Sequence, residues 1–331
     1  MANKKIVVLT TGGTIASAHG SAGLSRSGAM SGEELMAMLQ VTSPLEAEIE
    51  VRTLLQKPSN AITLADLLLL RNTCQAVAAE PGVVGIVVTH GTDTLEETAY
   101  FLDITLNLEG CALVVTGSQR APHQVASDAH RNLADALLVA GTAEASQLGV
   151  VVVFHESLYA ARHVRKVHSY QLDGFHSPEF GKLGFVDSGR VFIEQLPVRR
   201  PCLRVGDTLP RVDILPVYIE AATDLLDASL ATGSRGIVIE GVGRGHAPPD
   251  WLAAVERAQR QGVPVVVTSG CQQGPVHQSY EFPGSLASLE ANGAVAAHNL
   301  SARKARLKLA ALLSHPENGG GASVRQHFVT G

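Results

Sequence analysis

The sequence predicts an α/β protein built from two units, each a parallel β-sheet covered by helices. Short runs rich in β-branched residues recur along the chain, and stretches with helical spacing of apolar residues lie between them. A proline-containing segment without periodicity separates an earlier series of such runs from a later one. At 331 residues the chain is also long enough for two domains.

The elements of the N-terminal unit follow from this patterning. Strands are expected at residues 6–9, 83–88, 113–115 and 150–154. Helices are expected at residues 64–79 and 131–140, where apolar side chains recur every three or four positions. This alternation predicts a doubly wound sheet of the flavodoxin or Rossmann kind, with helices on both faces.

A second, smaller parallel sheet is predicted after FIEQLPVRRPCLRVGDTLPRV, a segment with three prolines. Strand-like runs at 237–239 and 263–267 belong to it, and Ser301 is expected to cap the final helix. The glycine-rich tail after that helix is expected to fray. We therefore expect an N-terminal domain over 1–192, a linker over 193–211 and a C-terminal domain over 212–331.

Composition excludes several classes of protein. The net charge is −5, Lys and Arg are scattered and aromatic residues make up 4%, so we expect no nucleic-acid partner. No apolar run approaches the ~20 residues of a membrane-spanning helix, and no membrane association is expected. The N-terminus lacks the pattern of a secretory signal and the four cysteines lack metal or disulfide spacing. These features predict a cytoplasmic protein.

The stretch VVTHGTDTLEETAYFLD, residues 87–103, places a polar cluster between a predicted buried strand and a predicted helix. Such turns line the crevice at the carboxyl ends of parallel strands, where ligands bind. Asp93 and Glu96 have the spacing of a capping box, which is the purely structural interpretation. The alternative is that the cluster carries chemistry. His90 is expected to be a hydrogen-bonded turn histidine rather than a reactive group.

The first predicted strand ends in LTTGGTIAS, where glycines allow backbone N–H groups to approach a ligand. The nucleotide patterns G-x-G-x-x-G and G-x-x-x-x-G-K-[ST] do not occur there, so no nucleotide cofactor is expected. HESLY begins like the zinc motif H-E-x-x-H, but Tyr159 stands where the second histidine belongs, and no metal site is expected. The turns TGGT and HGTDT instead suggest nucleophilic hydroxyls that a base could activate.

Together, TGGTIAS and THGTDTLEETAYFLD resemble the two signature motifs of the bacterial L-asparaginase/glutaminase family. VVTGSQR, SDAHRNLADAL, GVG and NLSARKARLKLA extend the resemblance over nearly the whole chain. It implies a cofactor-free amidohydrolase that converts L-asparagine into L-aspartate and ammonia. The N-terminal domain would carry the chemistry and the C-terminal domain would complete the site. The resemblance also implies a homotetramer built from dimers, or a homodimer, with sites at the dimer interface.

The resemblance assigns catalytic roles to four residues. Thr14 corresponds to the nucleophile, and Thr92, Asp93 and Lys166 to a second catalytic group. These roles suit the reaction, because a carboxamide is a poor electrophile. Its hydrolysis needs an activated hydroxyl, donors for the oxyanion and a proton for ammonia. From the residues alone, Lys166 would be interpreted as an ordinary exposed lysine beside Arg165.

Four further residues are expected to bind substrate. Ser59 and Asn60, in KPSNAIT, match the family's substrate-binding loop, and Gly91 belongs to the second signature turn. Ser118 is expected beside the amide that is cleaved. Asp93 would also hold the α-amino group of the substrate.

The sequence departs from the family pattern in two places. The family has a tyrosine on a loop shortly after the first motif, whereas AHGSAGLSRSGAMSGEEL has none, and Ser25 or Ser27 lies nearest that position. A serine hydroxyl is shorter and less acidic than a phenol. In GVGRGHAPP, Arg244 follows the glycines where the family usually has asparagine. Tyr280 and Glu281 are candidates for the residue that reaches a neighbouring subunit.

Two other functions remain open at this point. One is an amino-acid sensor that keeps the pocket but has weak or no turnover. The other is a glutaminase or amidotransferase-type subunit, similar to the partner used in making glutaminyl-tRNA. Asparagine and glutamine differ by one methylene, which changes discrimination by only ~1–3 kcal/mol, so the sequence does not decide between them.

Overall fold

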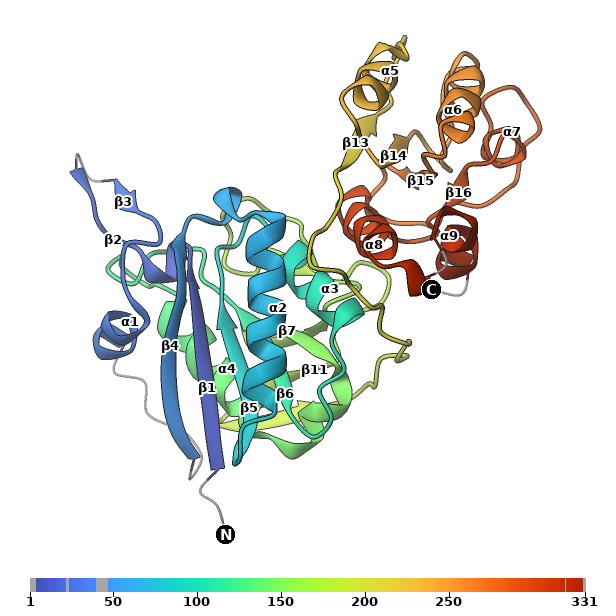
Figure 1. Ribbon diagram of the computed structural model, residues 1–331. Helices are drawn as coiled ribbons and strands as arrows, with labels where there is room; N and C mark the ends of the chain where they lie inside the picture. Colours follow the sequence, from blue (N-terminus) through green and yellow to red (C-terminus); the bar gives the residue numbers. More distant parts are fainter. Residues whose placement is uncertain (1–3, 22–23, 40–46, 319, 330–331) are drawn as a thin grey trace. The chain divides into compact units, whose positions relative to one another are not determined.

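The computed structural model describes residues 4–21, 24–39, 47–318 and 320–329. The chain divides into two compact units, Met1–Arg199 and Arg200–Gly331 (Figure 1). Residues 194–211, all of them described, form neither helix nor strand. The predicted α/β class, with a larger N-terminal and a smaller C-terminal sheet, is confirmed.

The N-terminal unit is organised around an eight-stranded sheet in the order β12-β11-β8-β7-β6-β5-β1-β4. Five neighbouring strands are parallel: β4 (Ala47–Lys57), β1 (Lys4–Gly12), β5 (Val83–Thr89), β6 (Ala112–Thr116) and β7 (Val150–Phe154). Antiparallel pairing continues the sheet through β8 (Ser157–Ala160), β11 (Gly184–Asp187) and β12 (Arg190–Ile193). The parallel strands end at one edge, so the turns that follow them are brought together there.

Helices cover both faces of this sheet. Helices α2 (Leu64–Ala78) and α3 (Leu95–Thr105) pack on one face, and α1 (Gly32–Leu39) and α4 (Ala129–Gly141) on the other. Successive residues of β1 alternate between the two cores, with Ile6 and Val8 facing α4 while Val7 and Leu9 face α2 and α3. Burial on both sides explains why these strands are continuous apolar runs.

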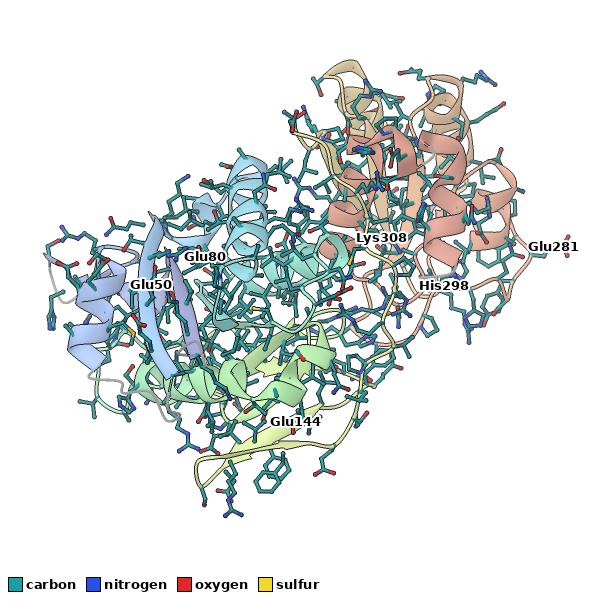
Figure 2. All side chains as sticks on the ribbon, turned by 60° about the horizontal axis from the view of Figure 1, so that its bottom comes forward. Glu50, Glu80, Glu144, Glu281, His298 and Lys308 are labelled. Carbon is teal, nitrogen blue, oxygen red and sulfur yellow. The ribbon has the colours of Figure 1, made fainter. Side chains whose placement is uncertain are left out.

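Apolar patterning did not predict strand β4. Its residues Glu48, Glu50 and Arg52 interrupt any apolar run, because β4 is the edge strand and is only partly buried. Charged pairs accompany its pairing with β1. Lys5 Nζ lies 2.7 Å from a Glu50 carboxylate oxygen, and Arg52 binds Glu80 at 2.6 Å. Figure 2 labels Glu50 and Glu80.

Two short hairpins were also not predicted. Strands β2 (Ala18–His19) and β3 (Ser25–Arg26) pair directly after the first turn. Strands β9 (Arg165–Lys166) and β10 (Phe175–His176) pair antiparallel, with Lys166 opposite Phe175. Neither pair contains an apolar run of the length that signals a strand in a sequence.

The C-terminal unit contains a four-stranded, fully parallel sheet: β13 (Val212–Pro216), β14 (Gly236–Gly241), β15 (Val265–Ser269) and β16 (Val295–Ala296). Its helices are α5 (Asp224–Ala231), α6 (Trp251–Arg260), α7 (Leu286–Ala291), α8 (Ala302–Ser314) and α9 (Gly320–Val329). The predicted cap of α8 is confirmed, since the Ser301 side chain accepts a hydrogen bond from the Lys304 backbone N–H.

The expectation that the glycine-rich tail frays is wrong, because helix α9 forms there. Val324 and Phe328 of this helix are each 1% exposed, so burial of apolar side chains outweighs the low helix propensity of glycine. The Lys308 ammonium also donates a 2.7 Å hydrogen bond to the His327 carbonyl.

Candidate active site

Three segments far apart in the sequence meet at the carboxyl edge of the N-terminal sheet. A Cβ atom on Gly13 would lie 2.3 Å from the Gly91 Cα, and one on Gly91 would lie 2.7 Å from the Ser59 Cβ. Gly13 also has a φ of +81°, in the left-handed region that favours glycine. The turn that carries Thr14 therefore packs directly on the turn that carries Thr92, which packs on Ser59.

Hydrogen bonds fix this arrangement. The Gly13 N–H donates to the Lys57 carbonyl at 3.0 Å, and the Thr11 hydroxyl donates to the Thr89 carbonyl at 2.9 Å. The Thr94 hydroxyl donates to the Ser59 carbonyl at 2.9 Å. Thr14 itself begins a short 3-10 turn, and its side chain is partly exposed. The hydroxyl of Thr14 thus stands on a backbone that is held from two sides.

Lys166 joins the other two predicted catalytic residues. Its Nζ donates to the Thr92 hydroxyl and to an Asp93 carboxylate oxygen, each at 2.7 Å. The Lys166 side chain is 13% exposed and that of Asp93 is 71% exposed. The ammonium is thus largely withdrawn from solvent, while the carboxylate stays accessible from outside.

The interpretation of Asp93 and Glu96 as a capping box is wrong. The N-cap of α3 is Thr94, and no side chain caps it. The Asp93 carboxylate instead pairs with Lys166, and the buried Glu96 carboxylate accepts the Lys166 backbone N–H at 2.5 Å. Both groups are occupied by a residue that lies about seventy positions away, which the local spacing cannot reveal.

Sequence reasoning missed Gln119 and the role of Glu96. The Thr92 hydroxyl donates to the Gln119 side-chain oxygen at 3.2 Å, and the Gln119 amide donates to the Gln171 carbonyl at 2.9 Å. Gln119 follows strand β6 in the motif VVTGSQR, so its position after a strand was the available signal. Thr92 therefore has a donor on one side and an acceptor on the other.

The predicted substrate-binding residues differ in exposure. Ser59 is 5% exposed and Gly91 is buried, whereas Asn60 is exposed. Ser118 is 0% exposed, and its hydroxyl donates to the Arg120 carbonyl at 2.7 Å. Ser59, Asn60 and Gly91 are brought together at the sheet edge, and Ser118 follows β6 at the same edge.

His90 underlies the second turn and confirms the expectation of a hydrogen-bonded turn histidine. Its ring is fully buried, and burial lowers its pKa to about 4. Nδ1 lies 2.8 Å from the Gly91 carbonyl, which can only accept, so Nδ1 carries the proton of the neutral ring. Nε2 then accepts from the Thr98 hydroxyl at 3.0 Å. The ring supports the turn as a neutral group.

The candidates for the missing tyrosine are both exposed. Ser25 lies in β3, and its hydroxyl is 3.1 Å from His123 Nε2, while Ser27 follows that strand. In the C-terminal unit, Tyr280 is 55% exposed, and Glu281 is exposed on the same loop (Figure 2). The Tyr280 ring packs edge-on against His246.

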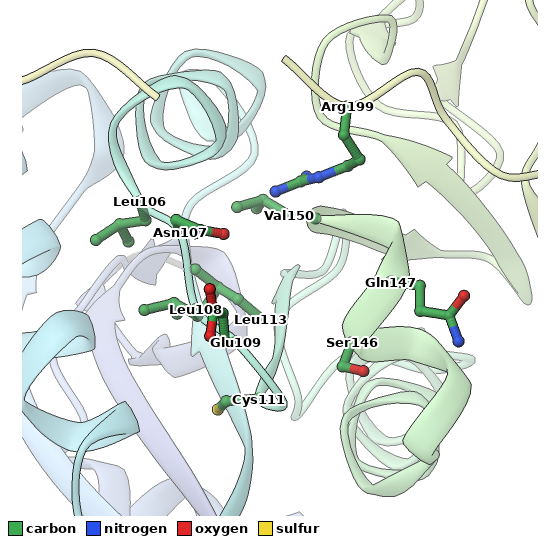
Figure 3. A pocket seen from close by; sticks show the side chains of 11 residues that line it. Leu106, Asn107, Leu108, Glu109, Cys111, Leu113, Ser146, Gln147, Val150 and Arg199 are labelled. Atoms are coloured by element: carbon green, nitrogen blue, oxygen red, sulfur yellow. The ribbon is translucent and has the colours of Figure 1, made fainter. Parts of the chain in front are cut away.

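A cavity of about 220 Å³ lies at the amino ends of β6 and β7, whereas the predicted site lies at the carboxyl ends of the parallel strands. Leu113 and Val150 form part of its lining, with the Arg199 guanidinium near Val150 (Figure 3). Arg199 donates to Asp103 at 3.2 Å, and burial raises the pKa of that carboxyl. None of the predicted site residues lines this cavity.

Two further properties hold for the described residues. No group of three or more His, Cys, Asp or Glu side chains there is arranged to hold a metal ion. No helix in those residues is long and apolar enough to cross a membrane.

Comparison with known proteins places both units. Residues 5–199 match the family model described as "Asparaginase, N-terminal", and residues 211–328 match "Glutaminase/Asparaginase C-terminal domain". The chain is 42% identical to an L-asparaginase of Bacillus licheniformis, over 96% of this chain and 98% of the relative. It is 31% identical to a glutaminase-asparaginase of Pseudomonas fluorescens biotype A, over 91% and 84% of the two chains.

A solved structure agrees with these matches. The crystal structure of a probable cytoplasmic L-asparaginase from Campylobacter jejuni superposes with a TM-score of 0.87 at 30% identity, covering 99% of each chain. Family models thus cover both units, and relatives above 30% identity cover nearly the full length. The predicted resemblance is confirmed, and the chain belongs to the asparaginase family.

Proposed function

We propose that this protein is an L-asparaginase, which hydrolyses L-asparagine to L-aspartate and ammonia. One observation carries the proposal: Lys166 Nζ contacts both Thr92 and Asp93 at 2.7 Å, on a turn that packs against the turn of Thr14. Two hydroxyls, an ammonium and a carboxylate thus meet at one edge of the sheet. The N-terminal domain, residues 1–192, carries this chemistry.

The reaction uses Thr14 as the nucleophile. Its oxygen attacks the amide carbon and gives up its proton, and the carbonyl oxygen gains negative charge that backbone N–H groups stabilise. The carbon–nitrogen bond then breaks, the nitrogen takes a proton and ammonia leaves. An aspartyl ester on Thr14 remains, and water cleaves it to aspartate while the Thr14 hydroxyl is restored.

Thr92 is placed to move a proton. With Lys166 as an ammonium, the Thr92 oxygen accepts from Nζ and its own proton points to Gln119. With Lys166 neutral, Nζ instead takes the Thr92 proton. The Asp93 carboxylate, at 2.7 Å from the same Nζ, holds the amine beside the Thr92 hydroxyl.

Asp93 also supplies the charge that recognises the substrate. Its side chain is 71% exposed, and only one of its carboxylate oxygens is needed for Lys166. The α-ammonium of an amino acid is a suitable partner for the accessible part of this carboxylate. Ser59, Asn60 and Gly91 lie beside this turn, and Ser118 follows the neighbouring strand; we assign these four to substrate binding.

Ammonia release by the purified protein tests the proposal. With millimolar L-asparagine we expect turnover in the range of typical enzymes, about 1–1000 per second, and none with a matched Thr14→Ala preparation. L-Glutamine in a parallel assay measures the preference between the two amides. Binding of asparagine without ammonia release would instead identify a sensor and overturn the proposal.

Location and assembly belong to the same proposal. The likeness to a relative named as probable cytoplasmic supports a cytoplasmic enzyme. A Haemophilus influenzae relative at 31% identity is named as probable periplasmic, so fractionation of producing cells is the deciding measurement. We expect a homotetramer or homodimer. Size-exclusion chromatography with light scattering would measure the molar mass and so decide between the two.

A further inference from the structure

The β2–β3 hairpin begins four residues after Thr14 and is tied to a second loop by His123. The Ser25 hydroxyl lies 3.1 Å from His123 Nε2. The His19 and His123 rings have centroids 3.9 Å apart, with 34° between their planes. His123 thus contacts a residue of each hairpin strand, since His19 belongs to β2 and Ser25 to β3.

The loop that carries His123 also contacts the second catalytic group. This loop joins β6 to α4, and the Asp128 carboxylate closes it by accepting the Gln119 and Arg120 N–H groups at 2.9 and 3.0 Å. Gln119 in turn accepts from the Thr92 hydroxyl. One closed loop therefore contacts Thr92 at one end and the hairpin that follows Thr14 at the other.

The base of the hairpin is held separately. The Gly28 N–H donates to the Gly13 carbonyl, and the Met30 N–H donates to the Ala16 carbonyl, each at 3.0 Å. The hairpin strands themselves are mostly exposed, so few packing contacts fix them. His123 Nδ1 is buried and has no hydrogen-bond partner among the described residues, which leaves Nε2 and the ring face to hold the hairpin.

We propose that His123 is a positioning residue for amide hydrolysis, which fixes the hairpin after Thr14 through the Ser25 hydroxyl and the His19 ring. The inference rests on the proposed function. The hairpin sequence contains no tyrosine, and the aromatic ring that packs on it comes from His123 of the facing loop. The segments of Thr14 and Thr92 are thereby kept in one arrangement while the amide reacts.

Kinetics of four variants test the role. In His123→Ala and Ser25→Ala we expect kcat for asparagine to fall about tenfold with KM within about twofold, the pattern of an interaction that matters mainly in the transition state. The double variant should lose no more than His123→Ala alone, because His123→Ala already removes the contact with the Ser25 hydroxyl. His123→Gln keeps a hydrogen-bonding group and should recover at least half of kcat.

His130→Ala is the matched control, since this exposed histidine lies on α4 just beyond the same loop. It should keep kcat within about twofold. An equal loss in His130→Ala, or full activity in His123→Ala, overturns the proposal. Ser25→Ala guards against misfolding, because Ser25 is an exposed residue on the hairpin and its loss leaves the cores intact.

A second measurement does not depend on turnover. Arg26 is exposed in β3, so trypsin cleavage after Arg26, followed by mass spectrometry, reports how well the hairpin is held. We expect cleavage about tenfold faster in His123→Ala than in the parent and unchanged in Thr14→Ala. Unchanged cleavage in His123→Ala refutes the contact, whereas faster cleavage in a protein without asparaginase activity refutes only the proposed function.

Discussion

The strand ends of the two units have the same architecture and different chemistry. In the N-terminal unit, the turn after β5 carries Thr92 and Asp93, and both contact the largely buried Lys166. In the C-terminal unit, the turn after β14 carries the exposed Arg244, which donates to His277 and to the Ser279 hydroxyl at 3.1 Å. A parallel sheet thus provides an edge where side chains converge, and the side chains decide what that edge can do.

The largest effect should come from the paired threonines. Thr14→Ala and Thr92→Val should each lower kcat at least about a thousandfold, or ~4 kcal/mol, because each removes a hydroxyl to which we assign a catalytic role. Ser269→Ala, at the end of β15 in the other unit, should stay within about threefold of the parent. Ammonia release and melting curves on the same samples would measure both. Near-normal turnover in either threonine variant would remove that residue from the mechanism.

The second largest difference should be between two cationic side chains, Lys166 of the N-terminal unit and Arg244 of the C-terminal unit, in their effect on kcat. Lys166→Met should lower kcat at least about a hundredfold, since it removes the group that contacts Thr92 and that we propose exchanges a proton with it. Arg244→Met, on the exposed turn of the C-terminal unit, should cost less than about fivefold. Equal losses in steady-state assays would mean that both strand ends contribute to the reaction.

The variant Asp93→Ala distinguishes a role of Asp93 in substrate binding from a role in capping helix α3. Asp93→Ala should lower kcat/KM about fiftyfold, or ~2.3 kcal/mol, through weaker binding of the substrate ammonium. Its melting temperature should stay close to that of the parent, because α3 has no side-chain cap to lose. A capping role would instead cost ~0.5–2 kcal/mol of stability and leave kinetics unchanged. Melts and kinetics on one preparation tell the two apart.

The turn histidines of the two units should differ in their effect on stability. The pKa of His90 is about 4 when folded, against 6.5 for an unperturbed histidine, because burial disfavours its charged form. Between those values the unfolded chain binds more protons, so the His90 contribution is complete above pH 6.5 and is lost as the pH falls toward 4. At pH 5 the loss amounts to ~2 kcal/mol.

Urea unfolding at pH 7.5 and 5 measures this effect. The decrease in unfolding free energy between the two pH values should be about 2 kcal/mol smaller in His90→Gln than in the parent. Burial also lowers the pKa of His246, on the turn of the C-terminal unit, but that ring is partly exposed. His246→Gln should therefore change the pH dependence less. The reverse order would contradict the assignment of His90 as a buried neutral group.

The smallest effect concerns Glu96, which holds Lys166 by its backbone. Glu96→Gln keeps an acceptor oxygen and loses the charge, so the 2.5 Å hydrogen bond weakens and kcat should fall about tenfold, or ~1.4 kcal/mol. Glu109→Gln is the control, because Glu109 is an exposed residue between α3 and β6. Its kcat should match that of the parent. Identical kinetics in both variants would show that Lys166 needs no such support.

The sequence predicted the features that depend on local patterning. Continuous apolar runs such as 83–88 identified the buried parallel strands, because both faces of those strands are covered. The sequence did not predict strand β4, because this edge strand is only partly buried and carries charged residues such as Glu50 and Arg52. The prediction that the glycine-rich tail frays was wrong because helix α9 depends on tertiary packing, in which Phe328 is buried, and local composition does not show such packing.

The site was predictable only in part. The turns of Thr14 and Thr92 stand out after their strands, whereas the resemblance alone identified Lys166. Its side chain reaches Thr92 from a two-residue strand that has no pattern of its own. Glu96 was assigned to a cap because its spacing suits one, yet its partner lies in β9. Gln119 acts through a contact across 27 positions, which no local spacing indicates.

The contact between Gly13 and Gly91 sets a condition for anyone who wishes to transplant or redesign this site. A methyl group at Gly13 would overlap the Gly91 backbone, and one at Gly91 would overlap the Ser59 side chain. The turns therefore pack together with no space for a side chain at either glycine. A substitution at Gly13 or Gly91 needs a matching change in the segment that faces it, while Thr14, Thr92 and Asp93 are kept. A portable version of the site therefore needs these three strand ends moved together with the β9 segment that carries Lys166.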